Sequence, residues 1–242
     1  MQDYRVDMAT SANIPVVLVH GWGGSFHNTW HKPGIDALLT DSGRRVIGID
    51  LLGHGTSDKP HDPIAYSRLH EWFLSALPAD DPVVDVVAFS LGALTALRAL
   101  IAAPNRFGRV VLAGIGDGVF EPHDPTASQR IVAALRGTAP ADDNIARLFG
   151  QYASQPGNDV NALIAIMQRP ESPPILASEI CAITNSVLVA IGDKDFASPA
   201  TQLAATFPNG SLVILKNTDH FATPEAFAFI DALLDFLPSD AT

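Results

Sequence analysis

Three residue types that together perform nucleophilic catalysis occur in this chain, each directly after a predicted strand. Ser90 lies between an apolar, strand-like run over Val83–Phe89 and an apolar, helix-like run over Leu91–Ala103. Asp195 and His220 follow the last two strand-like runs of the chain. A serine hydroxyl is a weak nucleophile until a histidine removes its proton, and a carboxylate orients that histidine. The set therefore predicts a nucleophile at Ser90, a base at His220 and an orienting acid in the loop that contains Asp195.

The peptide around Ser90 has the pattern of a sharp turn from a strand into a helix. Its sequence, Ala88-Phe89-Ser90-Leu91-Gly92, matches the G-x-S-x-G nucleophile elbow except that Ala88 replaces the first glycine. Small residues are needed there because the helix begins almost on top of the strand. A serine at such a turn can also simply cap the helix, but the aspartate and histidine that follow in order favour the catalytic interpretation.

Strand-like and helix-like runs alternate along most of the chain. Near-continuous apolar runs, typical of parallel strands covered on both faces, occupy residues 15–20, 45–50, 83–89, 109–113, 187–191 and 212–215, and a short edge strand is predicted at 3–8. Helices are predicted at residues 33–39, 68–77, 91–103 and 202–206, and a last one from Thr223-Pro224 with Phe227, Ile230, Leu233, Leu234 and Leu237 on its apolar stripe. This alternation predicts an α/β fold with a doubly wound, mostly parallel sheet, whose ligand site lies beyond the carboxyl ends of the strands.

The stretch over residues 117–184 interrupts this alternation. It is irregular and contains seven prolines, with helix-like runs at 128–135, 145–152 and 160–167. We therefore predict a core formed by residues 1–116 and 185–242, and an inserted helical cap or lid formed by residues 117–184.

Composition limits the partners and cofactors of the chain. Its 242 residues include 15 basic and 26 acidic side chains, a net charge of −11 that disfavours nucleic acid and anionic membranes as partners. The single cysteine, Cys181, excludes an intrachain disulfide. His27 and His31 have no third ligand at a suitable spacing, so no metal site is predicted. The chain has neither a P-loop nor a G-x-G-x-x-G after its first strong strand, so no nucleotide cofactor is predicted.

The same composition gives an expectation for localisation. The first fifteen residues lack the pattern of a signal peptide, and no apolar run approaches the ~18 residues that span a bilayer. These features predict a cytoplasmic protein without a membrane partner. They do not indicate an oligomeric state.

With these residues and motifs the chain resembles the α/β-hydrolase family. The resemblance covers roughly residues 14–116 and 186–237, and it rests on His20-Gly21-Trp22-Gly23-Gly24, on Gly53-His54-Gly55 with Ser57, and on Ser90, Asp195 and His220 in that order. It implies an α/β-hydrolase core and a cofactor-independent serine esterase. Such an enzyme would cleave a small carboxylic ester through an acyl-enzyme on Ser90.

The resemblance also implies an oxyanion hole. In the α/β-hydrolase family one donor is the backbone N–H of the residue after the nucleophile, which is Leu91 in this chain. The second would be the backbone N–H of Trp22, after His20-Gly21. His20 and His54 are expected to hold loops together and not to take part in catalysis.

Several carboxylates compete for the role of the acid. Family spacing after Gly192 favours Asp195 over Asp193, and Asp117, after the fourth strand, is a third candidate because some relatives relocate the acid. Asp219 is too close in sequence to orient the ring of its neighbour.

Other activities of the same scaffold stay open. A carbon–carbon bond hydrolase or a cofactor-free haloperoxidase would use the same three side chains, and a hormone receptor of this fold would bind a ligand without turnover. Epoxide hydrolases and haloalkane dehalogenases of this fold use an aspartate nucleophile, and Ser90 argues against both.

Overall fold

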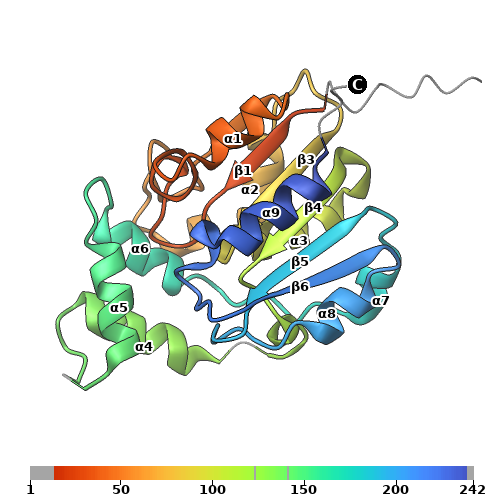
Figure 1. Ribbon diagram of the computed structural model, residues 1–242. Helices are drawn as coiled ribbons and strands as arrows, with labels where there is room; N and C mark the ends of the chain where they lie inside the picture. The colour runs from red at the N-terminus through yellow and green to blue at the C-terminus, as the bar shows by residue number, and fades with distance from the viewer. Residues whose placement is uncertain (1–13, 123, 141, 239–242) are drawn as a thin grey trace, which may run out of the picture.

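The centre of the molecule is a six-stranded sheet, seen in a computed structural model that describes residues 14–122, 124–140 and 142–238 (Figure 1). The strands are β1 (Val16–Val19), β2 (Val46–Ile49), β3 (Val84–Phe89), β4 (Phe107–Ala113), β5 (Val187–Gly192) and β6 (Gly210–Leu215). Their order across the sheet is β2-β1-β3-β4-β5-β6, and every neighbouring pair is parallel. The carboxyl ends of all six strands therefore lie at one edge, where the loops with the predicted site residues begin.

Helices cover both faces of this sheet. Those of the core are α1 (Ile35–Asp41), α2 (Leu69–Ala76), α3 (Leu91–Ala102), α7 (Ala177–Cys181), α8 (Thr201–Thr206) and α9 (Phe227–Phe236). α1 and α9 pack on one face through residues such as Leu39 and Phe229, and α2, α3, α7 and α8 pack on the other through residues such as Phe73 and Leu97. Burial on both faces explains why the central strands β1, β3, β4 and β5 are apolar, while the edge strands β2 and β6 are partly exposed. The predicted doubly wound α/β fold is confirmed.

Three further helices follow β4 and lie together at one end of the molecule (Figure 1). They are α4 (Pro125–Leu135), α5 (Asn144–Ala153) and α6 (Val160–Met167). Ile131, Leu163 and Ile166 of these helices share a buried apolar cluster with Trp22 and Leu52 of the core loops. The helical insert thus sits over the strand-end loops. The bounds of the predicted cap, 117–184, stay a prediction.

The last helix differs from its prediction. Residues Thr223–Glu225 form a 3₁₀ turn, and Ala226 is extended (φ −69°, ψ 125°), so α9 begins only at Phe227. Pro224 suits the tight turn because it has no N–H to leave unsatisfied. Phe227 was predicted on the apolar stripe of this helix, but its side chain is 86% exposed. Phe229, which was not predicted on the stripe, lies in the core.

Other differences from the predicted elements are small. α4 begins at Pro125, with the Asp124 side chain accepting a hydrogen bond from the Thr126 N–H, and not at residue 128. The short helix α7 and a five-residue π-helix at His27–His31 were not predicted. The predicted strand at 3–8 lies outside the described residues.

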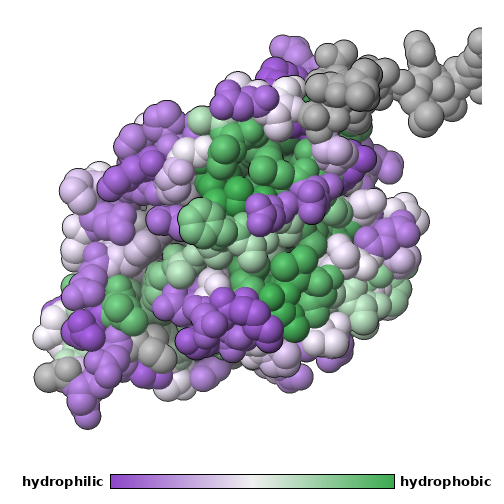
Figure 2. Space-filling view, viewed as in Figure 1, coloured by the Kyte–Doolittle hydropathy of each residue, from purple (hydrophilic) through white to green (hydrophobic). Residues whose placement is uncertain are grey.

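Hydrophobic surface gathers over α9 and the neighbouring strands, interrupted by hydrophilic side chains (Figure 2). Phe227 of α9 is exposed, and Ile214 of β6 is 49% exposed. Among the described residues, no helix has the length and apolar character that crossing a membrane requires.

Candidate active site

Ser90 occupies a strained turn between β3 and α3. Its φ of 55° and ψ of −116° fall outside the regions that a side chain with Cβ prefers, and such strain persists only where the surroundings impose it. Its N–H donates to the carbonyl of Ala113 on the neighbouring strand (2.8 Å). A Cβ at Gly92 would lie 2.4 Å from the carbonyl oxygen of His20, so α3 can pass there only because Gly92 lacks a side chain. The turn thus has the geometry of a nucleophile elbow.

Ala88 replaces the first glycine of the elbow motif without disturbing the turn. It is fully buried in the centre of β3, with Val19 and Leu112 as its partners on the adjacent strands. The substitution is accommodated because the close approach between helix and strand occurs at Gly92 and not at Ala88.

The structure brings Ser90, His220 and Asp195 into one hydrogen-bonded series. The His220 Nε2 atom lies 2.9 Å from Ser90 Oγ, and its Nδ1 atom lies 2.9 Å and 3.0 Å from the two Asp195 carboxylate oxygens. His220 and Asp195 are each only 5% exposed. With the carboxylate at Nδ1, the ring carries its proton there and presents an unprotonated Nε2 to the hydroxyl. This arrangement can transfer the Ser90 proton to His220.

The competing carboxylates are placed elsewhere. Asp193 lies 3.8 Å from Lys216 Nζ at the surface, and Asp117 accepts a hydrogen bond from the Leu203 N–H of α8 (2.8 Å). Asp219 accepts from the Ala222 N–H (3.0 Å). Asp195 Oδ1 also accepts from the Ala197 N–H (2.8 Å), which fixes its carboxylate toward His220.

Two backbone N–H groups in the loops that adjoin Ser90 have no acceptor among the described residues, and a Cβ at Gly21, before Trp22, would lie 3.0 Å from the Ser90 Cβ. Trp22 follows β1 and Leu91 follows Ser90, and β1 and β3 are adjacent in the sheet. Within residues 14–122, 124–140 and 142–238, no hydrogen bond uses the N–H of Trp22 or of Leu91. The Leu91 N–H also belongs to the first turn of α3, where the helix dipole is positive. Both groups are suited to stabilise a negative oxygen.

His20 and His54 hold the loops that carry these groups. His20 Nε2 accepts from the Leu51 N–H (3.1 Å), and His54 Nε2 accepts from the Gly23 N–H (3.0 Å). The Nδ1 atoms donate to the carbonyls of Gly21 (2.7 Å) and Leu52 (3.2 Å). The prediction that both histidines bond loops together is confirmed.

These two histidines make the stability of the fold depend on pH. Burial, with a smaller effect of the like charge of His20, lowers the pKa of His54 to about 3, and burial also lowers the pKa of His20. In the unfolded chain each ring binds a proton below about pH 6.5, while folded His54 stays neutral down to about pH 3. Their contribution to stability is therefore complete above pH 6.5 and decreases as the pH falls.

We expect His54→Gln to weaken this pH dependence. Glutamine can still accept from the Gly23 N–H but binds no proton, so the loss of unfolding free energy from pH 6 to pH 4 should be about 2 kcal/mol smaller than in the wild type. Urea unfolding at the two pH values measures this difference. The matched control is His27→Gln, an exposed side chain that bonds neither of these loops, and this variant should keep the larger pH dependence. Equal slopes in all three proteins would contradict the interpretation.

Aromatic side chains cover His220 and were not predicted from the sequence. The ring of Phe196 lies 4.3 Å from that of His220, and the ring of Phe221 lies 5.6 Å from it. Phe149 of α5 contacts Phe196, Phe221 and Trp22 at centroid distances of 6.0, 5.4 and 5.6 Å. Phe196 and Phe221 directly follow Asp195 and His220, a signal available in the sequence. No sequence signal pointed to Phe149, because only tertiary packing brings the helical insert over the site.

Two tryptophans outside the site, and the His27–His31 pair, have contacts of their own. Trp30 is fully buried and Trp72 packs against two apolar clusters. His31 pairs with Asp36 (2.7 Å), and its ring lies 5.3 Å from that of His27. Among the described residues, no three His, Cys, Asp or Glu side chains lie together in a way that could hold a metal ion.

Comparisons with known proteins bear on the family and the fold. A family model described as the alpha/beta hydrolase fold matches residues 14–146. An esterase of Mycobacterium tuberculosis is 32% identical over 152 residues, which are 61% of this chain and 49% of that protein, so the match spans about half of the relative. A 2-hydroxy-6-oxononadienedioate/2-hydroxy-6-oxononatrienedioate hydrolase of Pseudomonas putida is 26% identical over 92% of this chain and 87% of its own length. The enol-lactonase of Burkholderia xenovorans has the same fold, with a TM-score of 0.72 and 22% identity over 93% of this chain and 92% of its own.

Proposed function

The chain belongs to the alpha/beta hydrolase family, and from that premise we propose that it is a serine hydrolase that cleaves small carboxylic esters. The observation that carries the proposal is the hydrogen-bonded series from Ser90 Oγ through His220 to Asp195, with contacts of 2.9 to 3.0 Å. A nucleophile, a base and an orienting acid in contact are the requirements of acyl transfer. The relative of Mycobacterium tuberculosis, an esterase, supports the same class of reaction.

In the proposed reaction, an acyl group passes from the substrate to Ser90 and then to water. His220 Nε2 takes the proton of Ser90 as Oγ attacks the ester carbonyl, and Asp195 stabilises the charged ring. The negative carbonyl oxygen of the tetrahedral intermediate lies against the N–H groups of Trp22 and Leu91. His220 then gives its proton to the leaving alkoxide, and the acyl-enzyme is hydrolysed by a water that His220 activates.

The surroundings of the series favour an apolar acyl or alcohol group. The aromatic cover formed by Phe149, Phe196 and Phe221 limits the access of water to His220. A covered site of low polarity strengthens the electrostatic effect of the two backbone N–H groups. It also favours esters whose non-reacting parts can pack against aromatic rings.

A second candidate is a carbon–carbon bond hydrolase. It is favoured by the Pseudomonas putida relative, the 2-hydroxy-6-oxononadienedioate/2-hydroxy-6-oxononatrienedioate hydrolase, which aligns with 92% of this chain. The same three side chains serve both reactions, so the two candidates are distinguished by which substrates the protein turns over.

A panel of substrates tests the proposal. We expect turnover of p-nitrophenyl esters from acetate to octanoate, with a maximum at a short or intermediate chain length and little cleavage of a vinylogous diketone. Cleavage of the diketone far above that of every ester would favour the carbon–carbon bond hydrolase. Tight binding of a ligand without any turnover would favour a receptor of the same fold.

A further inference from the structure

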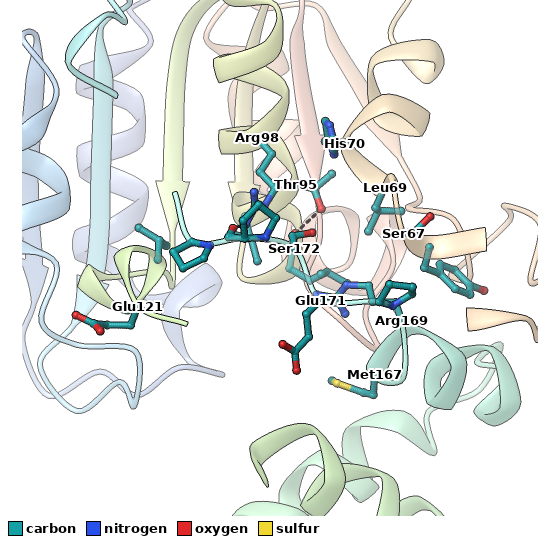
Figure 3. A pocket seen from close by; sticks show the side chains of 18 residues that line it. Ser67, Leu69, His70, Thr95, Arg98, Glu121, Met167, Arg169, Glu171 and Ser172 are labelled. Atoms are coloured by element: carbon teal, nitrogen blue, oxygen red, sulfur yellow. Dashed lines mark hydrogen bonds between the residues drawn. The ribbon is translucent and has the colours of Figure 1, made fainter. Parts of the chain in front are cut away.

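A cavity of about 140 Å³ is lined by Leu91, the residue after the nucleophile, and by two arginines (Figure 3). Leu91, Leu94, Thr95 and Arg98 form one wall, and they lie on one face of α3 because they are three, four and seven residues apart. The opposite wall includes Arg169 and the segment that follows α6. The cavity therefore reaches from the residue after Ser90 to a guanidinium two helical turns away.

Neither arginine is paired with an acid among the described residues. Arg98 Nη2 donates to the carbonyl of Pro173 and Arg169 Nη1 to that of Ile166, both at 2.6 Å, while no described carboxylate oxygen lies within 4.0 Å of either guanidinium. Glu121 and Glu171 also line the cavity, but they are exposed, and their carboxylates point away from Arg98 in Figure 3. Most of the N–H donors of the two guanidinium groups are thus available to a ligand.

Two neighbouring, partly buried guanidinium groups repel each other, which raises their free energy unless an anion lies between them. Burial and the like charge of Arg98 lower the pKa of Arg169, and burial lowers that of Arg98 in spite of the opposing charge of Glu179. The pKa of His70, which also lines the cavity, is lowered mainly by burial, so the neutral form of this ring is favoured. In a chain with 26 acidic and 15 basic side chains, a pair of arginines without a carboxylate partner favours an anionic ligand.

We propose that Arg98 and Arg169 bind a carboxylate of the substrate, so that the preferred esters are monoanions such as half-esters of dicarboxylic acids. The planar guanidinium fork matches the two oxygens of a carboxylate and is the usual donor for it in partly buried sites. The rise of a helix places the Cα atoms of Leu91 and Arg98 about 10 Å apart, which corresponds to a linker of several carbons between ester and carboxylate. This inference rests on the proposed ester hydrolysis at Ser90.

Matched substrates test the inference. We expect mono-p-nitrophenyl esters of glutaric, adipic and pimelic acid to have a kcat/KM about 10- to 100-fold above that of the same esters with a neutral carboxamide in place of the carboxylate. Arg98→Gln and Arg169→Gln should reduce the ratio of the two kcat/KM values toward 1. The reduction should come from a higher KM for the carboxylate esters, while kcat/KM for the carboxamide esters should change little. Arg169→Lys should keep part of it because it keeps the charge. The control Arg147→Gln, on the exposed surface of α5, should leave it unchanged.

The outcomes separate this inference from the proposed function. Turnover of the carboxamide esters without a preference for the carboxylates would overturn the arginine site and leave the esterase intact. If neither ester is cleaved, titration calorimetry with adipate on the wild type and on the two glutamine variants decides. Binding by the wild type that both variants lose would support the site, and the absence of binding by the wild type would overturn it.

Discussion

Replacing Ser90 with alanine is expected to lower kcat for p-nitrophenyl esters by about 10⁶-fold, because the variant loses the hydroxyl that lies 2.9 Å from His220 Nε2 and is placed to form the acyl-enzyme. The backbone N–H groups of Trp22 and Leu91 remain, so a small rate above that of the uncatalysed reaction should persist. Steady-state kinetics on enzyme free of contaminating esterase measures the loss.

The fold should tolerate this change. Ser90 is partly exposed, and its hydroxyl has one hydrogen bond, to His220. We expect the thermal midpoint of the variant to stay within a few degrees of the wild type. Undiminished ester turnover in the folded variant would rule out Ser90 as the nucleophile.

Replacing Asp195 with asparagine is expected to lower kcat by about 10⁴-fold. The amide removes the negative charge 2.9 Å from His220 Nδ1, and its NH₂ group can turn the ring to the tautomer that has a proton on Nε2. That tautomer cannot accept the proton of Ser90. The binding of substrate should change much less, because Asp195 does not contact it in the proposed reaction.

Asp193 provides a matched control two residues away. Its carboxylate faces Lys216 at 3.8 Å and not the histidine, so Asp193→Asn should keep kcat within about twofold of the wild type. Equal losses in the two variants would contradict the assignment of the acid to Asp195. A loss of kcat in Asp193→Asn alone would assign the role of the acid to Asp193 instead.

The core of this protein could be predicted because its central strands are buried on both faces. Near-continuous apolar runs such as Val84–Phe89 have few alternatives to a central parallel strand, and their ends were predicted within about two residues. The order of Ser90, Asp195 and His220 after successive strands was enough to expect them at one edge, since parallel strands end there together. The start of α9 was mispredicted because Thr223-Pro224 also suits a 3₁₀ turn, and the extended Ala226 follows from packing.

The parts of the site that depend on the helical insert could not be predicted. Phe149 and Arg169 lie in segments with no motif, and their roles arise from tertiary contacts with residues more than 45 positions away, such as Phe196 and Arg98. An aromatic residue on an amphipathic helix predicts by itself only a position in the core. An arginine after the end of a helix predicts by itself only a solvated position. The substrate preference proposed here therefore comes from the structure.

The central claim is that Ser90 is activated by His220 for attack on a carbonyl, and covalent labelling tests it most directly. The protein is treated with a fluorophosphonate, digested, and mapped by mass spectrometry in the wild type and in His220→Ala. We expect one adduct per chain, on the peptide that contains Ser90, and a labelling rate at least 10³-fold lower in the variant. An adduct on any other residue, or equally fast labelling of Ser90 without His220, would contradict the account.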